Sequence, residues 1–85
     1  MEALDGNAIA GLLQEVFGHD MTTASGVCAR CGDERLVAEC SVYMRAPGVV
    51  VRCRTCGNVL AVIVARNELH CVDLQGLRAL HAHPG

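Results

Sequence analysis

Two short cysteine motifs constrain this chain more than any other feature. Each is a C-x-x-C pair followed directly by glycine, and their cysteines are Cys28, Cys31, Cys53 and Cys56. In so tight a loop the two thiolates converge on one point, and the glycine permits the positive φ that closes the turn. Two such loops together supply four sulfurs, the tetrahedral ligand set of structural zinc sites. The motifs therefore predict one metal ion per chain, bound by all four cysteines.

Two other chemistries use paired cysteines of this kind. The four thiols could form disulfides, or they could bind iron as the paired loops of a rubredoxin do. Rubredoxin-like cores are rich in aromatic residues, whereas this chain has one Tyr, one Phe and no Trp. We therefore favour a metal over disulfides, and Zn²⁺ over iron. Four thiolates would close the coordination shell, so the sequence predicts a structural site and no enzyme.

Length and charge limit what the chain can be. Its 85 residues suffice for a single domain with a small core, which a bound metal would help to stabilise. The formal charge is −2, and ionising four thiols around one divalent ion would make it −4. No lysine is present, so the composition lacks the basic excess of most nucleic-acid-binding proteins. The N-terminus is acidic and the longest apolar run, residues 59–65, is short, which predicts a cytoplasmic protein without a membrane span.

The first third of the chain predicts a helix over residues 5–17. Asp5 or Asn7 could cap its start and Gly18 could end it. Helical spacing places five apolar side chains on one stripe, namely Ile9, Leu12, Leu13, Val16 and Phe17. We expect this stripe to cover the protein's own sheet rather than a partner.

The remainder predicts strands. Residues 36–45 alternate as a strand with one apolar face would, and Ala46-Pro47-Gly48 has the composition of a turn. Further strands are expected over 49–52, 58–66 and 69–72, with a hairpin turn at 66–68. Residues 59–65 are apolar on both faces, which predicts cover from the N-terminal helix or from a second subunit. Leu74, Leu77 and Leu80 recur at every third residue and predict a short C-terminal helix.

The predicted fold class is α+β. We expect a zinc ribbon with a three- to four-stranded antiparallel sheet, an N-terminal helix and a short C-terminal helix. Within the single domain 1–85, the N-terminal helix spans 1–19, the ribbon 20–73, and the short helix with its tail 74–85. Cys40 and Cys71 lie inside predicted strands, where both are interpreted as small packing residues. A thiol redox switch that uses Cys40 or Cys71 is the less favoured alternative.

The motif cysteines and glycines, with the strand–loop–strand layout expected around them, resemble the zinc-ribbon superfamily over residues 27–72. The whole chain, opening Met-Glu-Ala-Leu-Asp-Gly-Asn-Ala, also looks like a family of small, uncharacterised bacterial proteins built on such a ribbon. The resemblance implies a zinc site and a β-rich core. It implies no activity, because ribbons serve many roles.

Three arginines are candidate partner contacts. Arg30 and Arg54 lie inside the two cysteine loops, and Arg52 precedes the second. They could bind phosphate, or they could offset the negative charge of a zinc–thiolate centre. Because the chain is acidic overall, we expect a module that binds a protein partner or itself, a homodimer included. Nucleic-acid binding is the alternative.

Overall fold

The computed structural model describes residues 4–18, 20–45, 48–67 and 69–82. Short helices and strands alternate along the described chain. In order, the elements are β1 (Leu4–Asp5), the 3₁₀ helix η1 (Gly6–Ile9), α1 (Ala10–Phe17), β2 (Ser25–Cys28), β3 (Glu34–Leu36), the 3₁₀ helix η2 (Val37–Glu39), β4 (Ser41–Arg45), β5 (Gly48–Arg52), β6 (Val59–Arg66), β7 (Leu69–Asp73) and β8 (Leu77–His81).

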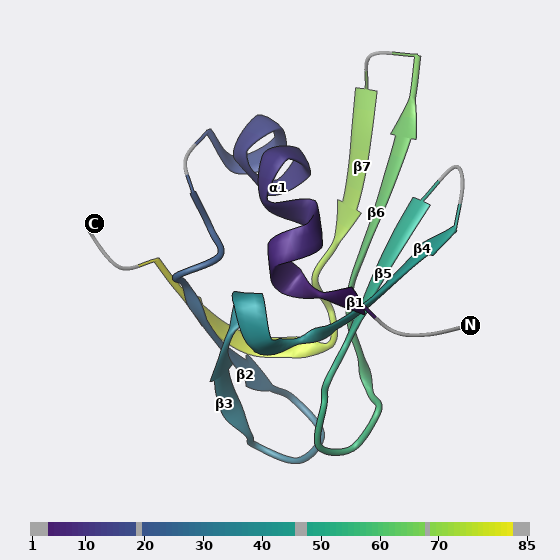
Figure 1. Cartoon of the computed structure of the whole chain (residues 1–85). Helices are drawn as coiled ribbons and strands as arrows, with labels where there is room; N and C mark the ends of the chain where they lie inside the picture. Colours follow the sequence, from purple (N-terminus) through teal and green to yellow (C-terminus); the bar gives the residue numbers. More distant parts are fainter. Residues whose placement is uncertain (1–3, 19, 46–47, 68, 83–85) are drawn as a thin grey trace.

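The described strands form two antiparallel sheets. The large sheet has five strands in the order β1-β4-β5-β6-β7, and the small sheet has three in the order β3-β2-β8. Figure 1 shows α1 lying beside the large sheet, with the small sheet below it. The α+β class is confirmed, but the prediction of a single sheet of three or four strands was wrong.

The division into two sheets arises where one strand was predicted over residues 36–45. The 3₁₀ helix η2 interrupts it, so β3 joins the small sheet and β4 joins the large one. The backbone N–H of Leu36 donates to the Glu39 carboxylate (3.2 Å), and the N–H of Cys40 donates to the Val37 carbonyl (3.1 Å). These local bonds close a helical turn that the apolar alternation did not reveal.

The predicted C-terminal helix was also wrong. The chain instead turns where the N–H of Leu77 donates to the Leu74 carbonyl (3.0 Å), and β8 then pairs with β2. Leu77 and Leu80 pack against the buried core from this strand. Antiparallel pairing with β2 stabilises this segment as a strand more than the weak helical pattern of three leucines would stabilise a helix. The predicted tail beyond residue 82 lies outside the described residues.

The N-terminal helix starts later than predicted. Asp5 acts as the expected cap, accepting from the N–H of Asn7 (3.1 Å), but it starts η1 rather than an α-helix. Residues 4–5 form β1, which pairs with β4, and the α-helix begins only at Ala10. Gly18 ends it as predicted, with φ of 81° and an N–H that donates to the Gln14 carbonyl (2.8 Å).

The apolar stripe of the helix covers the protein's own sheet, as predicted. Ile9 and Leu13 are buried in the same cluster as Ala61 and Ile63 of β6. On the opposite face of β6, Val62 and Val64 are only half-buried. The helix therefore covers one face of this strand, and the other face remains partly open.

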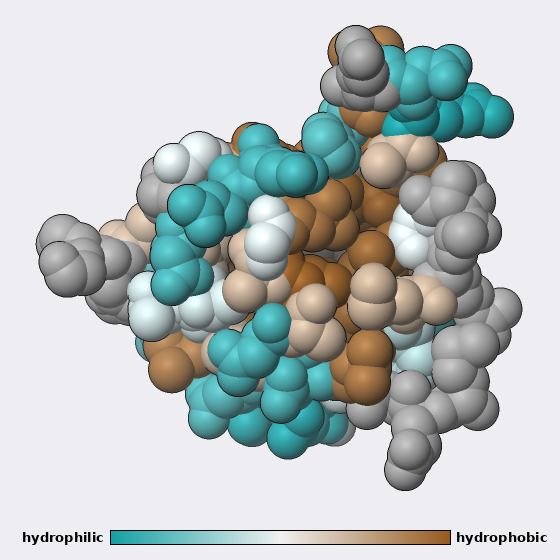
Figure 2. Space-filling view, turned by 45° about the horizontal axis from the view of Figure 1, so that its top comes forward, coloured by the Kyte–Doolittle hydropathy of each residue, from teal (hydrophilic) through white to brown (hydrophobic). Residues whose placement is uncertain are grey.

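Figure 2 shows an apolar hollow in the surface between the helix side and the sheet side of the molecule. Its volume is about 40 Å³, and its lining includes Leu13, Phe17, Ile63 and Leu77. Around it lies the buried core, which joins residues of α1 to residues of both sheets.

Two predicted turns fall partly outside the described residues. Residues 46–47 of the first are not described, and β4 and β5 pair up to Arg45 and Gly48 on either side. Glu68 of the second is not described, and β6 and β7 pair up to Arg66 and Leu69. In the described residues, no helix is long and apolar enough to cross a membrane.

Candidate metal centre

Both cysteine motifs fold into the same backbone turn. The N–H of the first cysteine donates to the carbonyl five residues later, Cys28 to Asp33 (3.0 Å) and Cys53 to Asn58 (2.8 Å). The N–H of the motif glycine donates back to the carbonyl of that cysteine, at 3.0 Å in the first turn and 2.9 Å in the second. Gly32 and Gly57 have φ of 77° and 78°, so both need the conformation that glycine adopts without strain. We refer to these turns as the first and second knuckles.

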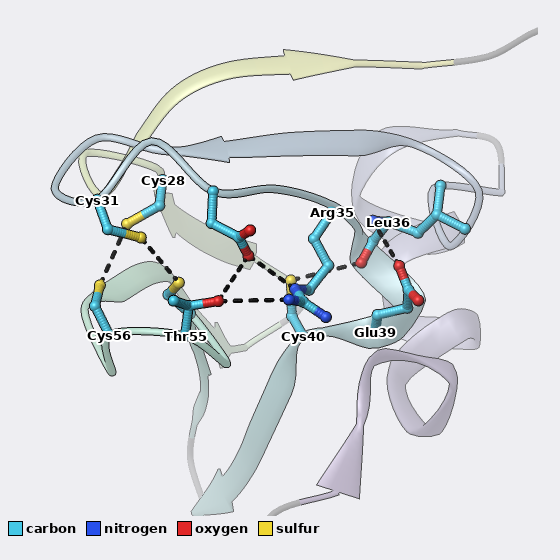
Figure 3. A network of polar contacts seen from close by, with 10 residues as sticks. Cys28, Cys31, Arg35, Leu36, Glu39, Cys40, Thr55 and Cys56 are labelled. Atoms are coloured by element: carbon cyan, nitrogen blue, oxygen red, sulfur yellow. Dashed lines mark hydrogen bonds and ion pairs between the residues drawn. The ribbon is translucent and has the colours of Figure 1, made fainter.

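The knuckles come from different sheets. The first links β2 to β3 in the small sheet, and the second links β5 to β6 in the large sheet. Their tips face each other, so that the sulfurs of Cys28 and Cys31 meet those of the second knuckle (Figure 3). The four predicted ligands are therefore brought together by tertiary structure.

The sulfur positions fit a tetrahedral metal ion. All four Sγ atoms lie within 4.8 Å of one another, and the Cys28–Cys56 and Cys31–Cys53 pairs are each 3.6 Å apart. A tetrahedron with zinc–sulfur bonds of about 2.3 Å has sulfur–sulfur edges of about 3.8 Å. Cys28 and Cys53 are buried, Cys56 is half-buried and Cys31 is exposed. The cluster can therefore hold one metal ion through four sulfur ligands.

The knuckles lower the pKa of two thiols, those of Cys28 and Cys53. Burial opposes ionisation of Cys28, but its sulfur accepts from the N–H groups of Cys31 and Arg30 and interacts with neighbouring thiols. These bonds outweigh burial and lower the pKa of Cys28 to about 6. The pKa of Cys53 is lowered as well: burial again opposes the shift, and the N–H groups of Cys56 and Thr55 outweigh it. Each knuckle thus stabilises the thiolate of its first cysteine.

Cys31 shifts in the opposite direction. The N–H of Asp33 favours its thiolate, but partial desolvation on the cluster side and hydrogen bonds with the other three thiols outweigh that contribution and raise the pKa of Cys31 to about 12. Four thiolates this close repel one another, so a metal-free cluster holds protons at neutral pH. A divalent cation would remove this penalty, which favours a metal over a free thiol cluster.

The Gly76 carbonyl connects the two knuckles. It accepts from the N–H of Ala29 in the first knuckle (2.9 Å) and from the side-chain amide of Asn58 after the second (3.4 Å). The same Asn58 amide lies 3.6 Å from the Cys28 sulfur, where it can donate to a thiolate. Asn58 therefore orients a ligand and joins the turn before β8 to the cluster.

A second polar bridge runs beside the cluster. One carboxylate oxygen of Asp33 accepts from Arg35 Nε (2.9 Å) and from the Thr55 hydroxyl (2.9 Å), as Figure 3 shows for the labelled Arg35 and Thr55. The hydrogen bonds from Arg35 and Thr55 lower the pKa of Asp33. The bridge ties the end of the first knuckle to the tip of the second.

Sequence reasoning missed Asn58 and the Asp33 bridge. A signal was nevertheless present. Asp33 and Asn58 occupy the same place in the two motifs, directly after the glycine, so each motif reads C-x-x-C-G followed by Asp or Asn. Gly76, whose carbonyl joins both knuckles, carried no comparable pattern.

The three arginines differ in their surroundings. Arg52 donates from Nη1 to the Gly57 carbonyl (3.0 Å) and lies over the Tyr43 ring at 5.8 Å. Arg52 therefore supports the second knuckle. Arg30 and Arg54 are exposed within the two knuckles.

The two remaining cysteines have different environments. Cys40 is buried, as predicted, and its thiol lies 3.7 Å from the Leu36 carbonyl. Burial, reinforced by the nearby Cys53, raises the pKa of Cys40, so its thiol is poorly suited to be a nucleophile. The prediction that Cys71 is a core residue was wrong, because it lies exposed on β7 at the end of the large sheet.

One sequence family matches the chain over its full length. Residues 1–85 match DUF6510, described as a family of unknown function. The chain belongs to the DUF6510 family. Comparisons with curated proteins and with solved structures gave no match for this DUF6510 protein.

Proposed function

We propose that this DUF6510 protein is a non-catalytic binding module whose four-cysteine centre holds one structural Zn²⁺. The supporting observation is that each sheet contributes one knuckle to the cluster of Sγ atoms. Bound there, the ion would neutralise thiolate repulsion and link the two sheets. Because four sulfurs complete a tetrahedral shell, the ion has a structural role and no substrate position.

Metal analysis of purified variants tests the ligand set. Cys31→Ser removes the exposed ligand of the cluster, and Cys71→Ser removes an exposed cysteine outside it. We expect one zinc per chain in the wild type and in Cys71→Ser, and strong loss in Cys31→Ser. Full occupancy after Cys31→Ser would contradict the assignment, and iron in the freshly purified protein would replace zinc as the native metal.

For the binding role, we propose a protein partner rather than nucleic acid. Arg52, although exposed, is engaged by the Gly57 carbonyl and the Tyr43 ring, whereas Arg30 and Arg54 are exposed within the knuckles. Two arginines on a chain of net charge −2 provide little positive charge for binding a phosphate backbone. By contrast, β7 presents an exposed apolar side chain on each of its faces, since Leu69 is 70% exposed and Val72 is 38% exposed.

Binding measurements at low salt separate the two roles. We expect the zinc-loaded protein to show no salt-sensitive affinity for mixed single- and double-stranded DNA and RNA. The double variant Arg30→Ala with Arg54→Ala should behave as the wild type does, and Arg78→Ala, an exposed arginine on β8, is the matched control. Affinity that falls steeply with salt and is lost only in the double variant would establish nucleic-acid binding instead.

A further inference from the structure

The edge strand β7 is exposed along its whole length. All five residues, Leu69–Asp73, are exposed, and in the described residues β7 pairs only with β6. The equally long edge strand β8 differs, since three of its five residues are half-buried. Natural sheets usually protect such an edge with proline, lysine, a bulge or a covering element. The sequence Leu-His-Cys-Val-Asp has neither proline nor lysine, and the pairing of β6 with β7 is regular.

The pairing of β6 with β7 determines which backbone groups face outward. Arg66 and Leu69 pair across the hairpin end, where a two-residue loop closes on a hydrogen-bonded pair. Hydrogen-bonded and non-hydrogen-bonded pairs alternate along an antiparallel ladder. The backbone groups of Cys71, which pairs with Val64, therefore point toward β6. Those of His70 and Val72 point away from β6 and can bond another strand.

These outward groups match a second β7 in one symmetric register. With a two-fold axis at Cys71, His70 of each chain faces Val72 of the other, and each such pair exchanges two backbone hydrogen bonds. Cys71 then faces its own copy as a non-hydrogen-bonded pair, with Cα atoms about 4.5 Å apart. That separation falls within the range of about 4.4–6.8 Å that allows a disulfide.

Side chains in this register are complementary. Leu69, Cys71 and Asp73 share one face of β7, so each Leu69 lies opposite Asp73 of the other copy. Across the sheet, Leu69 also pairs with Arg66 of its own chain. Leu69 therefore lies between Arg66 of its own chain and Asp73 of the other copy. On the other face, each Val72 lies opposite His70. The register opposes no like charges and covers both Leu69 and Val72.

We infer that a second copy of this chain is the partner that β7 binds, through antiparallel pairing of β7 with β7 about Cys71. This deepens the protein-binding role proposed above and names its partner. The two large sheets would join into one continuous sheet across the two-fold axis. One pair of five-residue strands buries less than the roughly 1,200–2,000 Å² of a standard interface, so we expect a weak, concentration-dependent dimer.

Cysteine cross-linking of the zinc-loaded full chain tests the register. Diamide, an azo oxidant, takes two electrons and two protons from a pair of thiols, which become one disulfide while its N=N bond is reduced to a hydrazine. We expect a covalent dimer in the wild type and none in Cys71→Ser. In the Cys71→Ser background, His70→Cys alone and Val72→Cys alone should cross-link poorly. The two together should cross-link well, because residues 70 and 72 face each other only between copies.

Equal cross-linking at positions 70, 71 and 72 would indicate random collision and would overturn the proposal. So would cross-linking of the wild type only through the cluster cysteines. Zinc content measured on the same samples keeps the two proposals separate: a zinc-loaded protein that fails to cross-link at Cys71 refutes the dimer and leaves the metal site standing.

Sedimentation velocity over a concentration series tests the association without cross-linking. His70→Pro removes an outward N–H and leaves the groups that face β6 intact, as edge strands tolerate. His70→Ala removes the same side chain, including its contact with Glu15 at 3.9 Å, but keeps the N–H. We expect His70→Pro to abolish dimerisation and His70→Ala to retain it. A wild type that stays monomeric up to millimolar concentration, or a His70→Pro variant that dimerises normally, would refute the proposal.

Discussion

At the scale of single residues, Gly76 occupies a place that no side chain can share. A Cβ atom there would lie 1.7 Å from the Val59 carbonyl oxygen and 2.6 Å from the Leu60 Cα. Its own carbonyl accepts from both knuckles. The turn before β8 can therefore approach β6 closely enough to join the metal cluster only because residue 76 lacks a side chain.

Gly76→Ala should destabilise the protein by about 3 kcal/mol, the upper range for overpacking, because the obstructing atoms are backbone. The matched control is Gly11→Ala in α1, where an added Cβ meets no atom within 4 Å. That change should stabilise the helix by about 0.5–1 kcal/mol. Urea unfolding at constant zinc measures both, and equal stability of the two variants would contradict the packing at Gly76.

The thiols also predict how metal binding depends on pH. The pKa of Cys28 is lowered from 9.0 to about 6 in the folded protein. The Cys28 thiolate therefore stabilises the metal-free fold fully above pH 9.0, and this contribution is lost as the pH falls through about 6. The pKa of Cys31 is raised to about 12, so its proton must leave when a metal binds at neutral pH.

Zinc affinity should therefore fall as pH falls from 8 to 5, because protons compete with the metal for the thiolates. Competition with a chromogenic chelator at several pH values measures this affinity once the chelator's own protonation is taken into account. An affinity that does not change across that range would contradict binding by the four thiolates.

At the scale of elements, α1 provides cover for one face of the large sheet. Ile9 and Leu13 are 2% and 4% exposed, and they share the buried cluster with Ile63 of β6. A helix of eight residues is marginal on its own, so it depends on this packing and on Gly18 at its end.

Deleting residues 1–18 should expose the inner face of β6 and make the protein aggregate or unfold at lower temperature. Leu13→Ala tests the same contact with the chain intact and should cost about 2–5 kcal/mol. Light scattering and thermal unfolding measure both effects. A truncated protein as stable and as soluble as the full chain would contradict the assigned packing.

At the scale of the whole molecule, the four-cysteine cluster lies where the two sheets meet. The small sheet has strands of four, three and five residues, and such a sheet needs additional support to persist in water. The large sheet, with the eight-residue β6 and most of the buried valines and isoleucines, is better supported.

Removing the metal with a chelator should therefore loosen the small sheet before the large one. We expect hydrogen exchange to accelerate most at β2, β3 and β8, and least at β5 and β6. Adding zinc back should restore protection. Uniform loss of protection across both sheets would mean instead that the protein unfolds in one step without its metal.

The features that sequence determined are local. Both knuckles, the Asp5 cap and the stop at Gly18 each depend on hydrogen bonds or a glycine φ within a few residues. The apolar stripe of α1 and the burial of Cys40 also followed from periodicity. Such features need no knowledge of distant neighbours, because the interacting groups are close along the chain.

Tertiary structure decided how the strands pair. Residues 36–45 were divided between two sheets, Leu77 and Leu80 entered β8 rather than a helix while Leu74 lies in the turn before it, and Cys71 became exposed because β7 is an edge strand. Asn58 and Asp33 gained their roles only when the knuckles met. How deeply a strand is buried depends on whether it becomes a central or an edge strand of its sheet. Contacts between residues far apart in sequence decide that position, so the local pattern does not reveal it.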